Sequence, residues 1–313
     1  MASRSDGAPK TVLVTGASGF TGRYMVQALE SRNYSVISLA SAVGLPDGAP
    51  QSQAGVAHVK RADLRDLRAL TRVMDEVRPD HVIHLAALAY VAHGQVDDFY
   101  QVNLMGTRNL LQAMQDAGHQ PSSVLLASSA NVYGNAYEGE ISESFAPRPA
   151  NDYAVSKLAM EHVAGLWSEK LPLIIARPFN YTGVGQEEKY LIPKIVSHFL
   201  RRDTEIELGN IDVWRDFGDV RAVVDAYAQL IALPLASLTT VNVCSGHSHS
   251  LREIVDLCRQ ITGQDISIKI NPAFVRSNEV RVLRGSNDRL RHLIGDWQSP
   301  PIQQTLEWML RTQ

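Results

Sequence analysis

The stretch TVLVTGASGFTG, residues 11–22, is the most informative part of the chain. Its first five residues are apolar or β-branched, which is typical of a buried strand. Gly16, Gly19 and Gly22 follow at once, and the residues after them predict a helix over 20–31. A strand, a glycine-rich turn and a helix in this order predict a site where backbone can approach a phosphate group.

Each glycine has a separate physical role in such a turn. Gly16 permits the tight turn, Gly19 lets the backbone approach a pyrophosphate, and Gly22 lets the helix pack on the strand. The spacing here is Gly-x-x-Gly-x-x-Gly, and a glycine-rich turn without a ligand is the alternative interpretation. The expected cofactor contacts of this turn are Gly16, Ser18, Gly19, Phe20, Thr21 and Gly22.

Short strands alternate with helices on both sides of this turn. Further strands are expected at 34–40, 56–60, 81–86, 123–128 and 171–177, and helices at 66–77, 96–117 and 152–169. This alternation predicts the α/β class, with a doubly wound parallel sheet of Rossmann type. The rhythm breaks after Arg177, which predicts a smaller C-terminal substrate-binding lobe.

The expected organisation has three parts. Residues 1–9 form a polar, disordered lead, and residues 10–178 form the NAD(P)-binding domain, to which 211–245 return. Residues 179–210 and 246–313 form the substrate-binding lobe.

Composition excludes several classes of protein. The 313 residues carry a formal net charge of -3, which gives no basic surface for nucleic acid or an anionic membrane. Two cysteines predict no disulfide framework and fit a cytoplasmic protein. The first residues lack the apolar segment of a signal peptide, and no stretch has the apolar length of a membrane span.

Other residues near the ends of predicted strands are candidates for the cofactor pocket. An acid after the third strand can accept a hydrogen bond from an adenine amine, and small residues after the fourth leave room beside a cofactor. These candidates are Asp63, Leu64, Leu85, Ala86, Ala87 and, in the long helix, Asn103. Each also has a structural interpretation, since Asp63 could cap a helix and Asn103 could be an ordinary polar helix residue.

The segments SSANVYG (128–134) and NDYAVSK (151–157) predict the chemistry. Ser129 follows a central strand, and ligands bind at the carboxyl ends of strands in doubly wound sheets. Tyr153 and Lys157 are four residues apart and share a helix face. The ammonium lowers the pKa of the phenol, which becomes a usable acid, and Ser129 can hold a carbonyl or alkoxide oxygen. Either pattern alone is common on amphipathic helices and turns; their order along the chain favours catalysis.

These motifs, together with HLAA, VNLMGT and RPFNYTGVGQ, resemble the extended short-chain dehydrogenase/reductase family of nucleotide-sugar enzymes. The resemblance implies NAD(P)-dependent redox chemistry at a sugar carbon, with Ser129, Tyr153 and Lys157 as the triad. It implies that the backbone of Arg177 and Pro178 lies near the nicotinamide. It also implies a homodimer formed through the helices near 96–117 and 152–169, as a four-helix seam.

Residues 208–227, 241–246 and 270–290 resemble more narrowly the branch that reduces GDP-4-keto-6-deoxy-D-mannose to GDP-D-rhamnose. That resemblance implies a GDP-linked substrate, although the base rests on resemblance alone. The implied substrate contacts are Ser129, Ala130, Asn131, Tyr153, Asn180, Lys194, Arg215, Arg276 and Glu279. Surface ion pairing is the alternative role for the charged residues of this set, and the segment 276–279 lacks a proline that relatives carry.

The residue two places after Ser129 separates the possible reactions. Dehydratases of the family carry an acid there, which acts as a base at the sugar, but this chain has Asn131. An amide cannot remove a carbon-bound proton at neutral pH, so dehydration is not expected. Reduction of the 4-keto group is favoured, with 4-epimerisation on a retained NAD as the alternative and a non-catalytic cofactor-binding scaffold as a remote one.

The choice of cofactor and the absence of a metal are expected from fewer residues. The second strand ends in Leu39-Ala40-Ser41 with no acid for the ribose hydroxyls of NAD, which favours NADP(H) and leaves NAD(H) possible. Arg61 is the nearby cation for a 2′-phosphate. The histidine pairs at 81/84 and 247/249 lack a ligand-like spacing or carboxylate partners, so no metal is expected.

Overall fold

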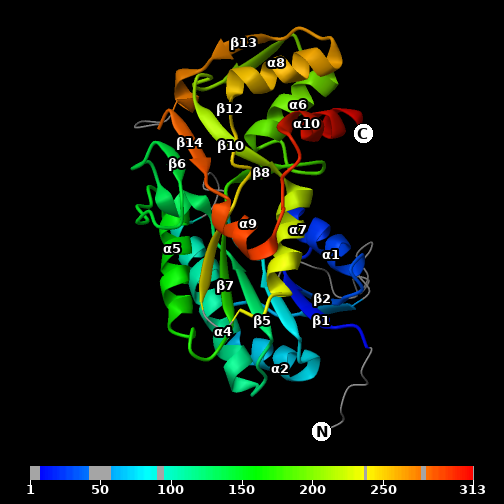
Figure 1. The fold of residues 1–313 in the computed structure, drawn as a ribbon, viewed down its shortest axis with the longest axis vertical. Coiled ribbons are helices and arrows are strands. Elements are labelled where there is room, and N and C mark those ends of the chain that lie inside the picture. Colours follow the sequence, from blue (N-terminus) through cyan, green and yellow to red (C-terminus); the bar gives the residue numbers. More distant parts are fainter. Residues whose placement is uncertain (1–7, 42–57, 90–94, 236–237, 276–279, 313) are drawn as a thin grey trace. The chain divides into compact units, whose positions relative to one another are not determined.

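The computed structural model describes residues 8–41, 58–89, 95–235, 238–275 and 280–312 (Figure 1). It divides the chain into two compact units, and each is built from separate segments. Unit 1 comprises 1–129, 151–176 and 227–240, and unit 2 comprises 130–150, 177–226 and 241–313. Most of the expected lead, together with Arg276 and Glu279, lies outside the described residues.

Unit 1 carries the expected sheet, whose seven strands lie in the order β11-β7-β5-β4-β1-β2-β3. The neighbouring pairs from β7 to β3 are all parallel. The strands are β1 (Thr11–Thr15), β2 (Ser35–Ala40), β3 (His58–Arg61), β4 (His81–His84), β5 (Ser123–Ala127), β7 (Leu173–Pro178) and β11 (Thr239–Val243). The doubly wound prediction is therefore confirmed, and the late strand β11 lies at one edge of this sheet.

Helices cover the sheet through apolar stripes. α1 (Phe20–Glu30) buries Met25 and Leu29. α2 (Leu67–Val77), α4 (Thr107–Asp116) and α5 (Asp152–Gly165) share one core with the strands, in which Leu70, Leu111 and Met160 are fully buried. α7 (Val220–Ile231) leads into β11.

The helix expected over 96–117 contains a local expansion. It begins as α3 (Val96–Phe99), continues as the π-helix η1 (Tyr100–Gly106) and ends as α4. Segments of π-helix are frequent at functional sites. Asn103 lies in the middle of η1 and is 1% exposed.

Unit 2 has smaller sheets. One has the order β12-β10-β14-β6, with β8 also paired to β10, and a second joins β13 to β9. The strands are β6 (Gly139–Ile141), β8 (Asn180–Thr182), β9 (Glu205–Leu208), β10 (Trp214–Asp219), β12 (Ser248–Ser250), β13 (Ser267–Ile270) and β14 (Val282–Gly285). A core lies among α6 (Leu191–Arg201), α8 (Leu251–Thr262) and α10 (Ile302–Arg311), and a short α9 (Asp288–Ile294) precedes α10.

The observed units differ from the expected boundaries in several places, including residues 177–178 and 241–245, which group with unit 2. Residues 130–150 group with unit 2 because β6 within them pairs with β14. Residues 211–226 also group with unit 2, since β10 belongs to its sheet and only β11 joins the large sheet. Within the described ranges, no helix is long and apolar enough to cross a bilayer.

Candidate active site

The glycine turn after β1 has the close packing that its sequence predicts. Gly16 has a φ of +70°, and a Cβ there would come within 2.7 Å of the Ala86 nitrogen. A Cβ on Gly22 would come within 2.1 Å of the Gly16 carbonyl oxygen. Gly19 is the N-cap of α1 and makes no side-chain cap. A side chain at Gly16 or Gly22 would displace protein backbone, so these two glycines are required for the packing of the turn. The N-terminus of α1 that follows the turn offers backbone amides that suit a phosphate group.

Ala86 and its neighbours lie directly against this turn. The Leu85 amide donates to the Thr15 carbonyl, and the Ala86 amide donates to Thr15 Oγ1 at 3.1 Å. Leu85, Ala86 and Ala87 are half-buried. The segment after β4 is therefore fixed beside the end of β1.

A chain of hydrogen bonds runs from this point through His84, which sequence analysis considered only as a metal ligand. His84 Nδ1 lies 2.7 Å from Thr15 Oγ1 and Nε2 lies 2.8 Å from Thr107 Oγ1. Thr107 itself donates to the Asn103 carbonyl, so His84 donates from Nε2 and accepts at Nδ1. Burial, with the Lys157 charge, lowers the pKa of His84 to about 3, and the ring is neutral.

Asn103 links the segment after β4 to α5. Its side-chain oxygen accepts from the Leu88 amide, and its nitrogen donates to the Leu88 carbonyl and to Ser156 Oγ. Ser156 donates in turn to the Tyr153 carbonyl. The amide expected to contact cofactor thus holds protein groups in this structure.

The proposed triad lies at the end of β5 and on α5, all within unit 1. Ser129 is 7% exposed and comes two residues after β5. Tyr153 and Lys157 occupy the first turns of α5, which Asn151 caps by accepting from the Ala154 amide. The Tyr153 ring packs edge-on against Phe99 with centroids 6.3 Å apart. Lys157 Nζ donates to the Ala127 carbonyl at 2.7 Å, which ties the helix to the strand.

Lys157 is a deeply buried cation of the site. Its side chain is 4% exposed, and loss of solvation lowers its pKa to about 8, while the Glu161 charge acts in the opposite direction. Glu161 accepts a short hydrogen bond from Ser128 Oγ. Sequence analysis missed Glu161 and Ser128, although position 161 continues the helix face of 153 and 157 at the same spacing of four.

Asp63 and Leu64, the expected adenine contacts, have structural partners. The Asp63 carboxylate accepts from the Arg65 amide, Nε and Nη2, and the Arg65 guanidinium holds the pKa of Asp63 below its usual value. Leu64 is 9% exposed and lies under Gly106 of η1.

Two expected cofactor or substrate segments lie in unit 2. Ala130 and Asn131 form part of the short 3-10 helix η2 (Ala130–Tyr133), where Ala130 is buried and Asn131 exposed. Arg177, at the end of β7 before Pro178, places its guanidinium 5.0 Å from the Tyr133 ring centre and donates to the Tyr133 hydroxyl. That hydroxyl donates to Asn242, which completes a buried polar network.

The remaining described substrate candidates contact backbone carbonyls of unit 2. Asn180 donates to the Asp216 carbonyl at 3.2 Å, and Arg215 to the Trp214 carbonyl at 2.9 Å. Lys194 donates to the Glu207 carbonyl, and its ammonium lies 4.7 Å from the Phe274 ring centre.

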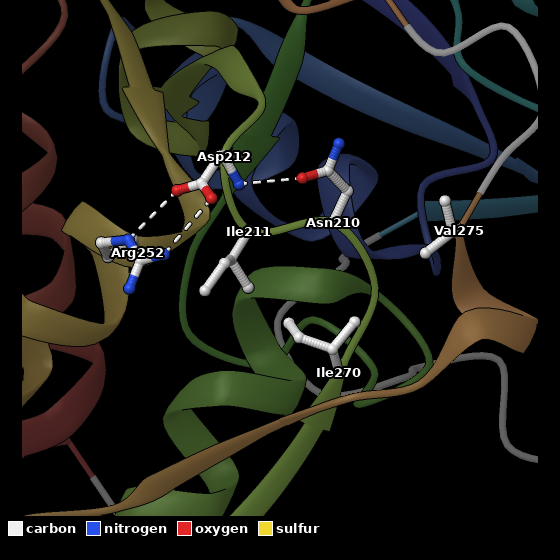
Figure 2. A pocket seen from close by; sticks show the side chains of 6 residues that line it. All are labelled: Asn210, Ile211, Asp212, Arg252, Ile270 and Val275. Carbon is white, nitrogen blue, oxygen red and sulfur yellow. Dashed lines mark hydrogen bonds and ion pairs between the residues drawn. The ribbon is translucent and has the colours of Figure 1, made fainter.

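A pocket of about 250 Å³ lies in this part of unit 2 (Figure 2). Apolar Ile211, Ile270 and Val275 line it, with Asn210 and the Asp212–Arg252 ion pair. None of the substrate candidates that the structure describes is among the residues lining it.

The part of the chain that the structure describes holds no cluster of three or more potential metal ligands. His81 donates from Nδ1 to Ser123, and His84 is engaged as described above. His249 lies 3.6 Å from Glu253, which is an ordinary pair one helical turn apart.

The model of the family described as GDP-mannose 4,6 dehydratase matches residues 13–309 of the chain. The GDP-6-deoxy-D-talose 4-dehydrogenase of Aggregatibacter actinomycetemcomitans is 33% identical, with 96% of this chain and 97% of that protein covered. The GDP-6-deoxy-D-mannose reductase of Pseudomonas aeruginosa is 35% identical, with 96% and 95% covered.

Solved structures agree with this result. The structure of RMD from Pseudomonas aeruginosa complexed with NADPH has a TM-score of 0.81, 34% identity and 96% coverage of both chains. That of a proposed epimerase from Burkholderia cenocepacia has a TM-score of 0.90, 46% identity, and 97% and 98% coverage.

The fold and site define a nicotinamide-dinucleotide-dependent oxidoreductase of the short-chain dehydrogenase/reductase class. Within that class, the chain belongs to the GDP-mannose 4,6-dehydratase family.

Proposed function

We propose that the protein reduces the 4-keto group of GDP-4-keto-6-deoxy-D-mannose and forms GDP-D-rhamnose. The observation that carries this proposal is Asn131, which stands where a dehydratase of the family needs an acid. The neighbouring Ala130 has no group that can move a proton either, so the chain keeps the residues for redox chemistry at a carbonyl and lacks those for dehydration.

Three side chains of this chain perform the protein's part of the reaction. Tyr153 gives its hydroxyl proton to the oxygen of the reduced carbonyl, and Ser129 donates a hydrogen bond to that same oxygen. Lys157 supplies the nearby positive charge that makes Tyr153 a stronger acid. A bound nicotinamide dinucleotide would supply the hydride. The glycine turn and the N-terminus of α1 would hold its pyrophosphate, and Leu85, Ala86 and Ala87 would lie alongside it.

The test is incubation with GDP-4-keto-6-deoxy-D-mannose and NADPH, followed by NMR of the product. Steady NADPH oxidation with GDP-D-rhamnose as product supports the proposal. In a parallel incubation with a GDP-hexose in place of the keto sugar, formation of its C4 epimer without net oxidation would establish the epimerase instead. Absence of both reactions, with NADPH bound, would favour a cofactor-binding scaffold.

A second candidate product differs only at C4. GDP-6-deoxy-D-talose is the C4 epimer of GDP-D-rhamnose, and the 33% identical relative is a GDP-6-deoxy-D-talose 4-dehydrogenase. The sugar face that meets the cofactor decides between them. The couplings of the sugar H4 in the product distinguish the epimers, because H4 is axial in one and equatorial in the other.

NADP(H) is the favoured cofactor. Arg61 pairs in register with Ala40, the last residue of β2, where NAD-dependent enzymes carry an acid for the ribose hydroxyls. Its side chain is exposed and suits a 2′-phosphate. The complex of RMD with NADPH is consistent with this choice.

Contacts to the nucleotide part of the substrate come from unit 2 in this proposal. The ammonium of Lys194 and the planar guanidinium of Arg215 suit the oxygens of a pyrophosphate. Contacts to a pyrophosphate would replace the hydrogen bonds that the two side chains now make to backbone carbonyls. Asn180 offers an amide, and Arg276 and Glu279 complete the set on grounds of resemblance.

We also propose a homodimer formed through α5 and the α3–η1–α4 helix. Large apolar side chains are exposed on or next to these helices, with Val96 49%, Met105 38%, Val155 38% and Leu166 74% exposed. A second copy would bury them in a seam of four helices.

A further inference from the structure

The catalytic helix and the end of β5 are joined by an acid that the proposed mechanism does not use. Tyr153, Lys157 and Glu161 follow one another at intervals of four on α5. Opposite them are consecutive residues of the strand end, where the Ala127 carbonyl accepts from Lys157 and the Ser128 hydroxyl donates to Glu161. Ser129, the next residue, belongs to the proposed triad.

Burial makes an acid at this position consequential. Glu161 is 7% exposed and Lys157 is 4% exposed, so their interaction is little screened by solvent. An isolated ammonium at that depth tends to lose its proton, whereas a carboxylate nearby favours the charged form. The Ser128 hydroxyl fixes the carboxylate and stabilises its ionised form.

The other titratable groups around Lys157 do not supply this negative charge. Tyr153 lies one turn earlier on α5, and His84 approaches from β4 as a neutral ring. η1 and α4 contribute the uncharged Asn103 and Thr107. Glu161 is the carboxylate that acts on Lys157.

We propose that Glu161 is a positioning residue: held by Ser128, its carboxylate provides the buried negative charge that keeps Lys157 an ammonium ion beneath Tyr153. Glu161 acts through Lys157 and does not touch substrate. This inference rests on the proposed function, because it assigns Lys157 the role of tuning Tyr153.

The test is the pH dependence of Glu161→Gln, which removes the charge and keeps the shape. Lys157 then loses its proton at lower pH, and Tyr153 loses the positive charge that makes it a stronger acid. The basic limb of kcat/KM should move down by about one pH unit, and kcat/KM at alkaline pH should fall about 10-fold. Activity on the acidic side of the limb should stay near that of the unaltered enzyme.

Three further variants guard against misfolding and general damage. In Glu161→Asp, the basic limb should lie close to that of the unaltered enzyme. In Ser128→Ala, the limb should move to lower pH as in Glu161→Gln, but by less. Glu169→Gln, at an exposed glutamate beyond the end of α5, is the matched control and should shift nothing. A uniform loss of activity at all pH values, or a lower melting temperature with an unmoved limb, would overturn the proposal.

A second readout separates this inference from the proposed substrate. Ultraviolet titration of the apo-protein reports tyrosinate formation, and subtracting the same titration of a Tyr153→Phe protein isolates Tyr153. The pKa of Tyr153 should rise in Glu161→Gln. If the pKa of Tyr153 rises but the unaltered protein does not reduce the proposed sugar, this inference stands and the proposed function is rejected. If the protein reduces the sugar but neither the pKa of Tyr153 nor the basic limb of kcat/KM changes in Glu161→Gln, the function stands and this inference is rejected.

Discussion

Tyr153 is the residue on which the proposed chemistry depends most. Its ring is fixed against Phe99, and it lies on the same helix face as Lys157, whose ammonium is buried and tied to Ala127. Such a pair is a common device for making a weak acid effective near neutral pH.

Tyr153→Phe removes only the hydroxyl, so turnover should fall about 10²–10⁴-fold, the usual contribution of a positioned acid. NADPH affinity should stay the same, because the variant leaves the glycine turn intact. Steady-state kinetics and a cofactor titration by fluorescence check the two parts. Tyr137→Phe, at a half-buried tyrosine whose hydroxyl donates to the Ala146 carbonyl, is the control. A Tyr153→Phe enzyme with most of its activity would reject the assignment.

At Gly22, steric crowding determines the effect of a substitution. Because a Cβ there would lie 2.1 Å from the Gly16 carbonyl oxygen, Gly22→Ala must displace backbone in the turn. The free energy of unfolding should fall by about 1–3 kcal/mol, and cofactor affinity should fall with it. Urea denaturation and cofactor titration measure the two effects.

Gly165→Ala is the matched control for Gly22→Ala. Gly165 ends α5, and the position that an alanine methyl group would take there lies in open space. Alanine should therefore be neutral at this position or stabilise the protein by up to about 1 kcal/mol. Equal effects of the two substitutions would show that backbone crowding at Gly22 is unimportant.

Among the elements, β4 carries two buried neutral histidines. Burial lowers the pKa of His81 to about 4 and that of His84 to about 3, so both stay neutral in the folded protein while they take up protons in the unfolded chain near pH 6.5. The unfolded state therefore binds more protons below that pH, and stability must fall as the pH falls.

Between pH 7 and pH 5, each histidine should reduce the free energy of unfolding by about 2 kcal/mol. Denaturant titrations at several pH values measure this slope. In His81→Gln, the number of protons taken up on unfolding, which sets this slope, should fall by about one. Replacing the exposed His58 by Gln should leave the slope unchanged. A stability that does not depend on pH in this range would contradict the buried, neutral state of both rings.

In the proposed function, the β2–β3 pair sets the cofactor preference. Arg61→Ala should weaken NADPH binding about 10-fold, the loss of one charge-assisted contact, and leave NADH binding unchanged. Fluorescence titration with each cofactor measures the two affinities. Lys60→Ala is the control, because Lys60 already pairs with Glu76 at 2.7 Å. Equal losses for both cofactors would show that Arg61 does not read the 2′-phosphate.

The regular elements of unit 1 were predictable from the sequence, because buried strands such as β1 and β5 are continuous apolar runs between clear breakers. The strands β6, β8 and β12 were not, since three residues are too short to show a period of two. The π-helical turn η1 was not predictable either, because one wider turn hardly changes the spacing of the apolar residues along the sequence.

The site shows the same limit at the level of side chains. The order of the motifs along the chain was enough to predict that Ser129 follows β5 and that Tyr153 and Lys157 lie on the next helix. It could not show that the side-chain amide of Asn103 hydrogen-bonds to Leu88 and Ser156. Those partners come from distant segments that only the folded chain brings together. Glu161 could have been found, because its spacing from Lys157 repeats that of Tyr153.

For the molecule as a whole, the exposed apolar residues of α5 and η1 predict the assembly state. Val155→Asp combined with Met105→Asp should convert a dimer into a monomer, because two carboxylates would be buried in the seam. Light scattering after size-exclusion chromatography measures the mass. Ile270→Asp, at a 47% exposed residue outside these helices, is the control. A protein that is monomeric before any substitution would reject the proposed seam.

The chain passes back and forth between its two units, and unit 1 takes its segments from 1–129, 151–176 and 227–240. No single cut therefore releases either unit as one continuous piece. A ribosome must translate past residue 240 before the first unit has all its parts, although the glycine turn emerges at the start. A single recombination breakpoint therefore cannot exchange the whole second unit for that of a relative, because its segments alternate along the gene with those of the first.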